Sequence, residues 1–123
     1  MIDHLSIQCA DVEASASFYD AVLAALGGRR VMDFGQVVGF GHEGKPEFWI
    51  GPCETGEGFR ECHLAFVAST RDEVGDFFDA AVRFGATVLH APRLWPEYHP
   101  SYFAAFVRDP DGNNVEAVCH LPE

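Results

Sequence analysis

The sequence predicts an α+β fold in which two βαβββ repeats form a cupped, mostly antiparallel eight-stranded sheet with the helices outside. Two observations predict it. The chain matches itself at a fixed offset, and each half passes from a strand pattern to a helix pattern and then to three short strands. The length of 123 residues, of which 48% are hydrophobic, suits one small globular unit. We therefore expect a single domain over residues 1–123, with half repeats at about 1–52 and 60–123.

The repeat rests on two tetrapeptides that recur 59 residues later in the chain. His4-Leu5-Ser6-Ile7 lies over His63-Leu64-Ala65-Phe66. At the same offset, Phe18-Tyr19-Asp20-Ala21 lies over Phe77-Phe78-Asp79-Ala80. Chance seldom produces two such agreements at one offset without a gap, so we interpret the chain as two related halves.

A strand opens each half and a helix follows it. Polar and apolar side chains alternate along the first strand, which predicts one face on the helix and an opposite, open face. Asp11 is the predicted N-cap of the first helix, whose apolar stripe ends at Gly27-Gly28. In the second half Thr70 and Glu73 fit a capping box, and Gly85 ends the helix.

Three short strands complete each half. One helix covers only one face of such a sheet, so the other face must pair with its copy or line a cavity. The Asp109-Pro110-Asp111-Gly112 segment predicts a tight turn, because proline fixes φ and glycine adopts a positive φ. The strands are expected near residues 30–34, 36–41 and 47–50 in the first half and near 86–90, 102–107 and 114–119 in the second.

Three side chains on the predicted open faces indicate a metal site. His4 and His63 occupy equivalent positions on the first strand of each half. Glu116 is the one acidic residue among apolar neighbours on the last strand, where a carboxylate is costly unless a positive group meets it. Two histidines and a carboxylate on neighbouring strands form a facial triad that leaves coordination positions open. The alternatives are hydrogen-bonded strand histidines and a glutamate that faces solvent.

The end of the chain carries a more specific pattern. The segment Tyr102–Glu116 reads YFAAFVRDPDGNNVE. With the paired strand–helix units and the strand histidines, it resembles the vicinal oxygen chelate superfamily, which includes glyoxalase I, extradiol dioxygenases, fosfomycin-resistance transferases and bleomycin-resistance proteins. The resemblance covers essentially the whole chain. It implies that His4, His63 and Glu116 bind one divalent metal ion and that the protein is a homodimer.

The chain departs from glyoxalase I at one position. That enzyme usually takes a fourth ligand from the last strand of the first half, and alignment of the two halves places Trp49 there. Tryptophan offers only an N–H donor and cannot ligate a metal. The nearest carboxylate, Glu47, lies two residues away beside a turn signal. We therefore expect a site with three protein ligands and interpret Trp49 as a cavity wall.

The segment from Pro92 to Pro100 is rich in proline and aromatic residues and has no counterpart in the first half. Such loops often cover binding sites. Beside Glu116, His99 and Tyr102 are the candidate catalytic residues, because they can hydrogen-bond a substrate or transfer a proton. The alternative is a rigid loop packed by its own aromatic side chains. The residues expected to line the substrate pocket are Phe40, Trp49, Arg93, Trp95 and Tyr98.

The charge and the cysteines limit the other possibilities. The net charge of −11 argues against nucleic-acid partners and against anionic membranes, which attract clustered basic residues. The start of the chain has no signal-peptide pattern, so we expect a cytoplasmic protein. A disulfide framework is not expected, and we interpret all four cysteines as packing residues: Cys9, Cys53, Cys62 and Cys119.

This donor set favours Lewis-acid chemistry on a small molecule that chelates the metal through two neighbouring oxygens. The ligands do not distinguish zinc, nickel, manganese and iron. A glyoxalase-type lyase or isomerase is the favoured function. The alternatives are an Fe(II) extradiol-type dioxygenase and a metal-free binding protein that sequesters a small molecule, as bleomycin-resistance proteins do.

Overall fold

Ten elements follow one another in the order that the two repeats predict, in a computed structural model that describes all 123 residues. The first half contains β1 (Leu5–Cys9), α1 (Val12–Ala24), β2 (Arg29–Asp33), β3 (Val38–Gly41) and β4 (Phe48–Pro52). The second half contains β5 (His63–Val67), α2 (Arg71–Phe84), β6 (Val88–Leu94), β7 (Phe103–Arg108) and β8 (Asn114–Cys119).

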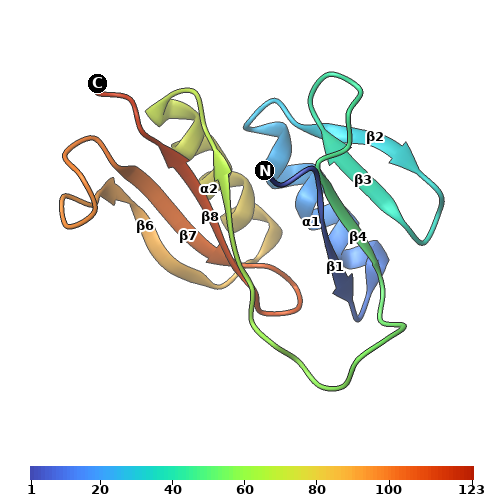
Figure 1. Cartoon of the computed structure of the whole chain (residues 1–123). Coiled ribbons are helices and arrows are strands. Elements are labelled where there is room, and N and C mark those ends of the chain that lie inside the picture. The colour runs from blue at the N-terminus through green and yellow to red at the C-terminus, as the bar shows by residue number, and fades with distance from the viewer.

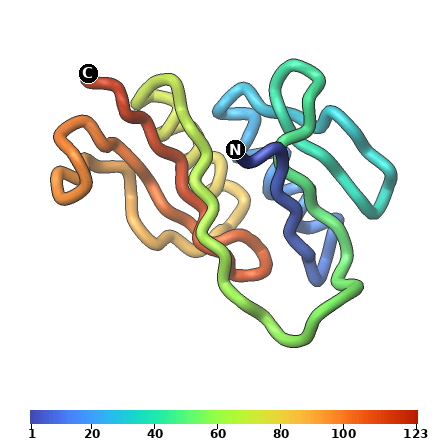
Figure 2. Tube along the Cα trace, viewed as in Figure 1, coloured from blue at the N-terminus to red at the C-terminus, as the bar shows by residue number.

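The two halves have the same sheet topology (Figure 1). The strand order is β1-β4-β3-β2 in the first sheet and β5-β8-β7-β6 in the second. The first and last strands of each half pair in parallel, and the other neighbours are antiparallel. The predicted α+β fold of two βαβββ repeats is therefore confirmed. Within one chain the two four-stranded sheets stay separate, and the trace in Figure 2 shows the long connection between β4 and β5.

The strand register confirms the alignment of the two halves. In the first sheet Ser6 of β1 pairs with Trp49 of β4. In the second sheet Ala65 of β5 pairs with Glu116 of β8. Ser6 and Ala65 are related by the repeat offset, so Trp49 and Glu116 occupy equivalent positions in their sheets.

Both predicted N-caps and the predicted end of α2 are also confirmed, whereas α1 ends at Ala24, before Gly27-Gly28. The Asp11 side chain accepts a hydrogen bond from the Ala14 backbone N–H at 3.0 Å and so caps α1. Thr70 caps α2 in the same way, by accepting from the Glu73 backbone N–H at 3.1 Å. Gly85 ends α2 with a φ of 95°, a left-handed conformation that other residues rarely adopt.

The hydrophobic core lies between the two helices and the inner faces of both sheets. Phe66 of β5 packs edge-on against Phe48 of β4, with ring centroids 5.3 Å apart, and it also meets Tyr19 of α1. Phe18 of α1 packs against Phe84 of α2 at 5.4 Å. One cluster of 24 buried apolar residues therefore extends through both halves. The outer face of each sheet has no helix over it and stays open.

A buried carboxylate ties the turn before β8 to α1. Asp109 is 5% exposed, and its Oδ2 accepts a hydrogen bond from the Tyr19 hydroxyl at 2.6 Å. Its Oδ1 accepts from the backbone N–H groups of Asp111 and Asn113. Gly112 has the positive φ, 98°, that the sequence predicts for this turn. Both oxygens of the Asp109 carboxylate thus have hydrogen-bond partners, which a buried polar group needs to offset the loss of water.

The strand predicted near residues 86–90 is longer and later than expected. β6 continues to Leu94, so Pro92 and Arg93 lie in the strand and the loop begins at Trp95. The register between β6 and β7 shifts between His90 and Arg93. This irregularity accommodates Pro92, which has no N–H to donate to the sheet.

The prediction for the cysteines is wrong for two of the four. Cys9 and Cys119 are buried, but Cys53 and Cys62 are exposed. The exposed pair lies in the connection between β4 and β5, outside the strands whose apolar runs suggested burial. No helix is both long enough and apolar enough to cross a membrane.

Candidate functional site

The open face of the second sheet carries the main cluster of chemically active side chains. Side chains alternate along β5, so Leu64 faces the core while His63 and Ala65 face outward. Ala65 pairs with Glu116 of β8, and Glu116 pairs with Phe106 of β7. These residues therefore share one face of three neighbouring strands.

Two of the three predicted metal ligands lie together on this face. The distance between His63 Nε2 and Glu116 Oε1 is 2.8 Å. The Glu116 side chain is only 1% exposed, whereas that of His63 is 54% exposed. Glu116 forms an ion pair with no basic side chain other than His63. The pair thus combines a buried carboxylate with an imidazole that reaches the solvent.

The other oxygen of Glu116 has a different partner. The hydroxyl of Tyr102, which lies just before β7, donates a hydrogen bond to Glu116 Oε2. Burial, together with this bond to the carboxylate, raises the pKa of the Tyr102 phenol above its ordinary value. Tyr102 therefore stays protonated and remains a hydrogen-bond donor at neutral pH.

The structure does not bring His4 to this pair within one chain. His4 lies one residue before β1, in the other half, and its Nδ1 is 2.8 Å from Asp3 Oδ1 at the surface. No three His, Cys, Asp or Glu side chains of the single chain are arranged to share a metal ion.

A group of rings surrounds Tyr102. The His99 ring nitrogen Nε2 is 2.9 Å from Nδ1 of His120, and the two imidazoles stack. The Ser101 backbone N–H donates to His99 Nδ1 at 3.1 Å, so the hydrogen of a neutral His99 is on Nε2. A cavity of about 470 Å³ lies beside these rings. It is lined by His63, Tyr98, His99, Tyr102, Phe106 and Glu116.

His120 belongs to this cluster although it is not among the site residues that the sequence predicts. It is exposed near the end of the chain, and it contacts His99 and Tyr102. The signal is present in the sequence, because His120 follows Glu116 by four residues and so falls on the same side of an extended strand.

Two of the predicted pocket residues, Trp95 of the loop and Arg93 of β6, pack against each other and do not line the cavity. Trp95 is 6% exposed, and its indole N–H donates to the Ala104 carbonyl at 3.1 Å. The Arg93 guanidinium lies 3.4 Å from the Trp95 ring centroid and pairs with Glu97 at 3.5 Å. These contacts match the alternative of a loop that is held rigid by its own aromatic residues. Only Tyr98, of the loop residues expected in the pocket, lines the cavity.

Trp49 lies on the open face of the first sheet, at the position equivalent to Glu116. Its ring stacks on Phe34, with centroids 6.4 Å apart and planes 3° apart. It also covers Gly39, where an added Cβ would come within 2.9 Å of the indole. Glycine at position 39 therefore lets the indole lie flat on the sheet.

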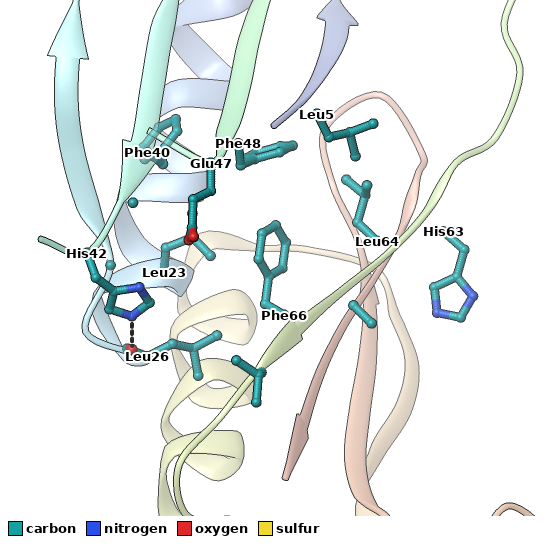
Figure 3. Close-up of a pocket in the computed structure, with 14 residues that line it drawn as sticks. Leu5, Leu23, Leu26, Phe40, His42, Glu47, Phe48, His63, Leu64 and Phe66 are labelled. Atoms are coloured by element: carbon teal, nitrogen blue, oxygen red, sulfur yellow. Dashed lines mark hydrogen bonds between the residues drawn. The ribbon is translucent and has the colours of Figure 1, made fainter. Parts of the chain in front are cut away.

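An apolar crevice separates the two halves on the core side (Figure 3). Its volume is about 360 Å³, and Phe40, Phe48 and Leu23 from the first half face Leu64 and Phe66 from the second. His63 is also among the residues that line the crevice, and Figure 3 shows its ring on the far side of β5 from these phenylalanines. Glu116 does not line the crevice, so the space beside Phe40 meets the His63–Glu116 pair only at His63.

The comparison with known families agrees with this arrangement. The model of the Glyoxalase/Bleomycin resistance protein/Dioxygenase superfamily matches residues 1–117. The chain belongs to this superfamily. Members of the superfamily often bind a divalent metal ion. No curated protein matches the chain in sequence.

Solved structures of the superfamily share the fold. A glyoxalase/bleomycin resistance protein from Albidiferax ferrireducens T118 is 25% identical, with 94% of this chain and 96% of that chain covered and a TM-score of 0.82. A family enzyme from Burkholderia phytofirmans PsJN is 22% identical, with 98% of both chains covered and a TM-score of 0.72. A lactoylglutathione lyase from Agrobacterium tumefaciens is 21% identical, with 97% and 92% covered and a TM-score of 0.70.

Proposed function

We propose that the protein is a metal-dependent lyase or isomerase of glyoxalase type, acting on a small molecule that presents two neighbouring oxygens. One divalent ion is held by His63 and Glu116 of one chain and His4 of a second chain. The observation that carries this proposal is the position of His63 Nε2 at 2.8 Å from Glu116 Oε1 on an open sheet face.

The residues of the second half suit a metal ion. A neutral imidazole nitrogen and a carboxylate oxygen are ligands for zinc, nickel, manganese and iron. Glu116 is buried with no Lys or Arg beside it, and a bound cation would compensate its charge. Because the superfamily often binds a divalent metal, we assign this role to the pair.

The third ligand requires a second copy of the chain. His4 and the His63–Glu116 pair belong to different halves, and each half leaves one sheet face open. Large apolar side chains are exposed on both faces, with Phe34 71% and Val67 67% exposed. Superfamily members often form dimers. A twofold dimer that joins the first half of one chain to the second half of the other would cover these side chains and complete two sites.

The ion, when bound, acts as a Lewis acid that stabilises negative charge on the chelated oxygens of the substrate. The chain's own residues supply the surroundings. Trp49 of the partner chain forms an apolar wall at the position of a fourth ligand. Because tryptophan cannot ligate the ion, one more coordination position stays open for the substrate. The Nε2 hydrogen of a neutral His99 points to His120 Nδ1, and this histidine pair beside the cavity is the proposed proton-transfer group.

The apolar crevice supports a second candidate function, the sequestration of a small molecule without a metal. Its volume of about 360 Å³ falls within the range of ligand pockets, and its walls are mostly hydrocarbon. A protein of this kind would bind its ligand equally well after Glu116→Gln, because Glu116 does not line the crevice.

Metal content and activity together test the two candidates. We expect one divalent ion per chain in the wild type and loss of the ion in His4→Ala, His63→Ala and Glu116→Gln. Activity is then measured on hemithioacetals of glutathione and on catechols under air. Turnover of a hemithioacetal supports the lyase or isomerase, and oxygen-dependent turnover of catechols with iron would assign a dioxygenase instead. Metal content that is unchanged in all three variants would contradict the proposal.

A further inference from the structure

We propose that Tyr102 is a positioning residue that makes Glu116 a ligand through one oxygen only. This inference rests on the proposed metal site. Tyr102 occupies Oε2 of the carboxylate, so that only Oε1 is directed to the ion that Glu116 shares with His63.

The two oxygens of Glu116 have distinct surroundings. Oε1 faces His63 Nε2 at 2.8 Å, and these are the two atoms that would bind the ion. Oε2 accepts the hydrogen bond from the Tyr102 hydroxyl. The carboxylate is 1% exposed, so solvent does not replace either partner. The side chain is therefore fixed with one oxygen toward His63 and the other away from it.

The position of the Tyr102 hydroxyl is itself well defined. Three rings pack against the phenol ring at steep angles, with centroids 4.9 Å away for Tyr98, 5.4 Å for His99 and 5.2 Å for His120. The Tyr102 backbone donates to the His99 carbonyl and accepts from the Trp95 N–H at 2.8 Å. The position of Tyr102 is thus fixed by ring contacts to its side chain and by hydrogen bonds to its backbone.

A one-oxygen carboxylate matters for the chemistry that the site is proposed to perform. A carboxylate that chelates an ion with both oxygens occupies two coordination positions, and a single oxygen occupies one. A substrate that binds through two neighbouring oxygens needs two adjacent open positions. Partners in the second layer around a metal orient its ligands, and their removal typically weakens metal binding by about 10–100-fold.

The test compares Tyr102→Phe with Tyr98→Phe, the same change at a neighbouring phenol whose hydroxyl has no hydrogen-bond partner in the chain. Affinity for Co²⁺ is measured by competition with a coloured chelator, and the Co²⁺ absorption spectrum reports the ligand set. We expect Tyr102→Phe to bind Co²⁺ about 10–100-fold more weakly, with an altered spectrum. Tyr98→Phe should keep the wild-type affinity and spectrum.

The outcomes separate this inference from the proposed function. If the wild type binds Co²⁺ and Tyr102→Phe matches it in affinity and spectrum, the positioning role is wrong while the metal site stands. A Tyr102→Phe protein that is merely less stable, with unchanged Co²⁺ binding, also overturns the positioning role. A wild type that binds no Co²⁺ overturns both.

Discussion

One register position has a different chemical role in each half of the molecule. Glu116 and Trp49 are equivalent in the two sheets, and both lie on open faces. Glu116 is buried between His63 and Tyr102, whereas Trp49 lies flat over Gly39 beside Phe34. A carboxylate can ligate a metal ion and an indole cannot, so we infer that the repeat supplies the proposed ligand pair in one half and an apolar wall in the other.

The hydroxyl of Tyr19 contributes to the stability of the folded chain. Its removal in Tyr19→Phe takes away the hydrogen bond at 2.6 Å to the buried Asp109. We expect a loss of about 1–3 kcal/mol in the free energy of unfolding, measured by urea denaturation. Tyr98→Phe is the control, because its hydroxyl is unpaired and exposed, and it should change stability by less than about 0.5 kcal/mol.

Tyr19 also makes the free energy of unfolding depend on pH. Burial first, and then the charge of Asp109, raises the pKa of Tyr19 above its unfolded value of about 10. Above pH 10 the unfolded chain loses this proton while the folded chain keeps it, so stability falls as the pH rises. We expect a shallower fall in Tyr19→Phe than in the wild type over pH 10–11, measured by urea denaturation at each pH. Equal slopes would contradict the role of Tyr19.

The sequence predicts several site residues but not the contacts between them. The strand pattern and the motif before Glu116 place His63 and Glu116 on one face, and the structure brings them together. Alternation identifies a face, not the half that lies opposite it, so the pattern alone leaves the partner of His4 open. The contact of Tyr102 with Glu116 depends on the path of the loop, which no periodicity encodes.

The helices show how far local signals determine an element. Asp11 and Thr70 cap α1 and α2 as the sequence predicts, because N-cap side chains act within one turn. The sequence predicts β6 too short, because the irregular pairing of this strand with β7 allows a proline inside it. Interactions within one helical turn can thus be predicted from the sequence, whereas the length of a strand depends on how it pairs with the neighbouring strand.

The cap of α2 provides a test at this scale. Thr70→Ala removes the acceptor for the Glu73 N–H, and we expect it to lower the free energy of unfolding by about 1 kcal/mol. Thr55→Ala is a matched control, because the Thr55 side chain makes no hydrogen bond and only its backbone pairs with Gln8. Equal stability of the two variants in thermal unfolding would show that the cap contributes nothing.

The cysteines distinguish strands from the connection between the halves. Burial raises the pKa of the Cys9 thiol on β1 to about 11, and Cys119 is buried on β8. Cys53 and Cys62 are exposed. We expect two thiols to react rapidly with a thiol reagent in the native protein and the other two only after unfolding. Rapid reaction of all four in the folded state would contradict the strand assignments.

At the scale of the whole molecule, the sequence predicts the two repeats but not how they are joined. A cup within one chain and a cup across two chains need the same strands, helices and open faces. In the single chain the two halves share a core through their helices, and their sheets do not close on one another. In our proposal, the metal site therefore needs residues from two chains.

Mixed dimers test this claim most directly. Differently tagged chains carrying His4→Ala and His63→Ala are co-expressed, and the mixed dimers are isolated. If the partner supplies His4, each mixed dimer has one site with both changes and one intact site, so we expect it to bind one metal ion although neither variant alone binds any. A mixture of His63→Ala with Glu116→Gln, both in the second half, has no intact site and should stay metal-free. Metal-free His4→Ala/His63→Ala mixed dimers would contradict the shared site.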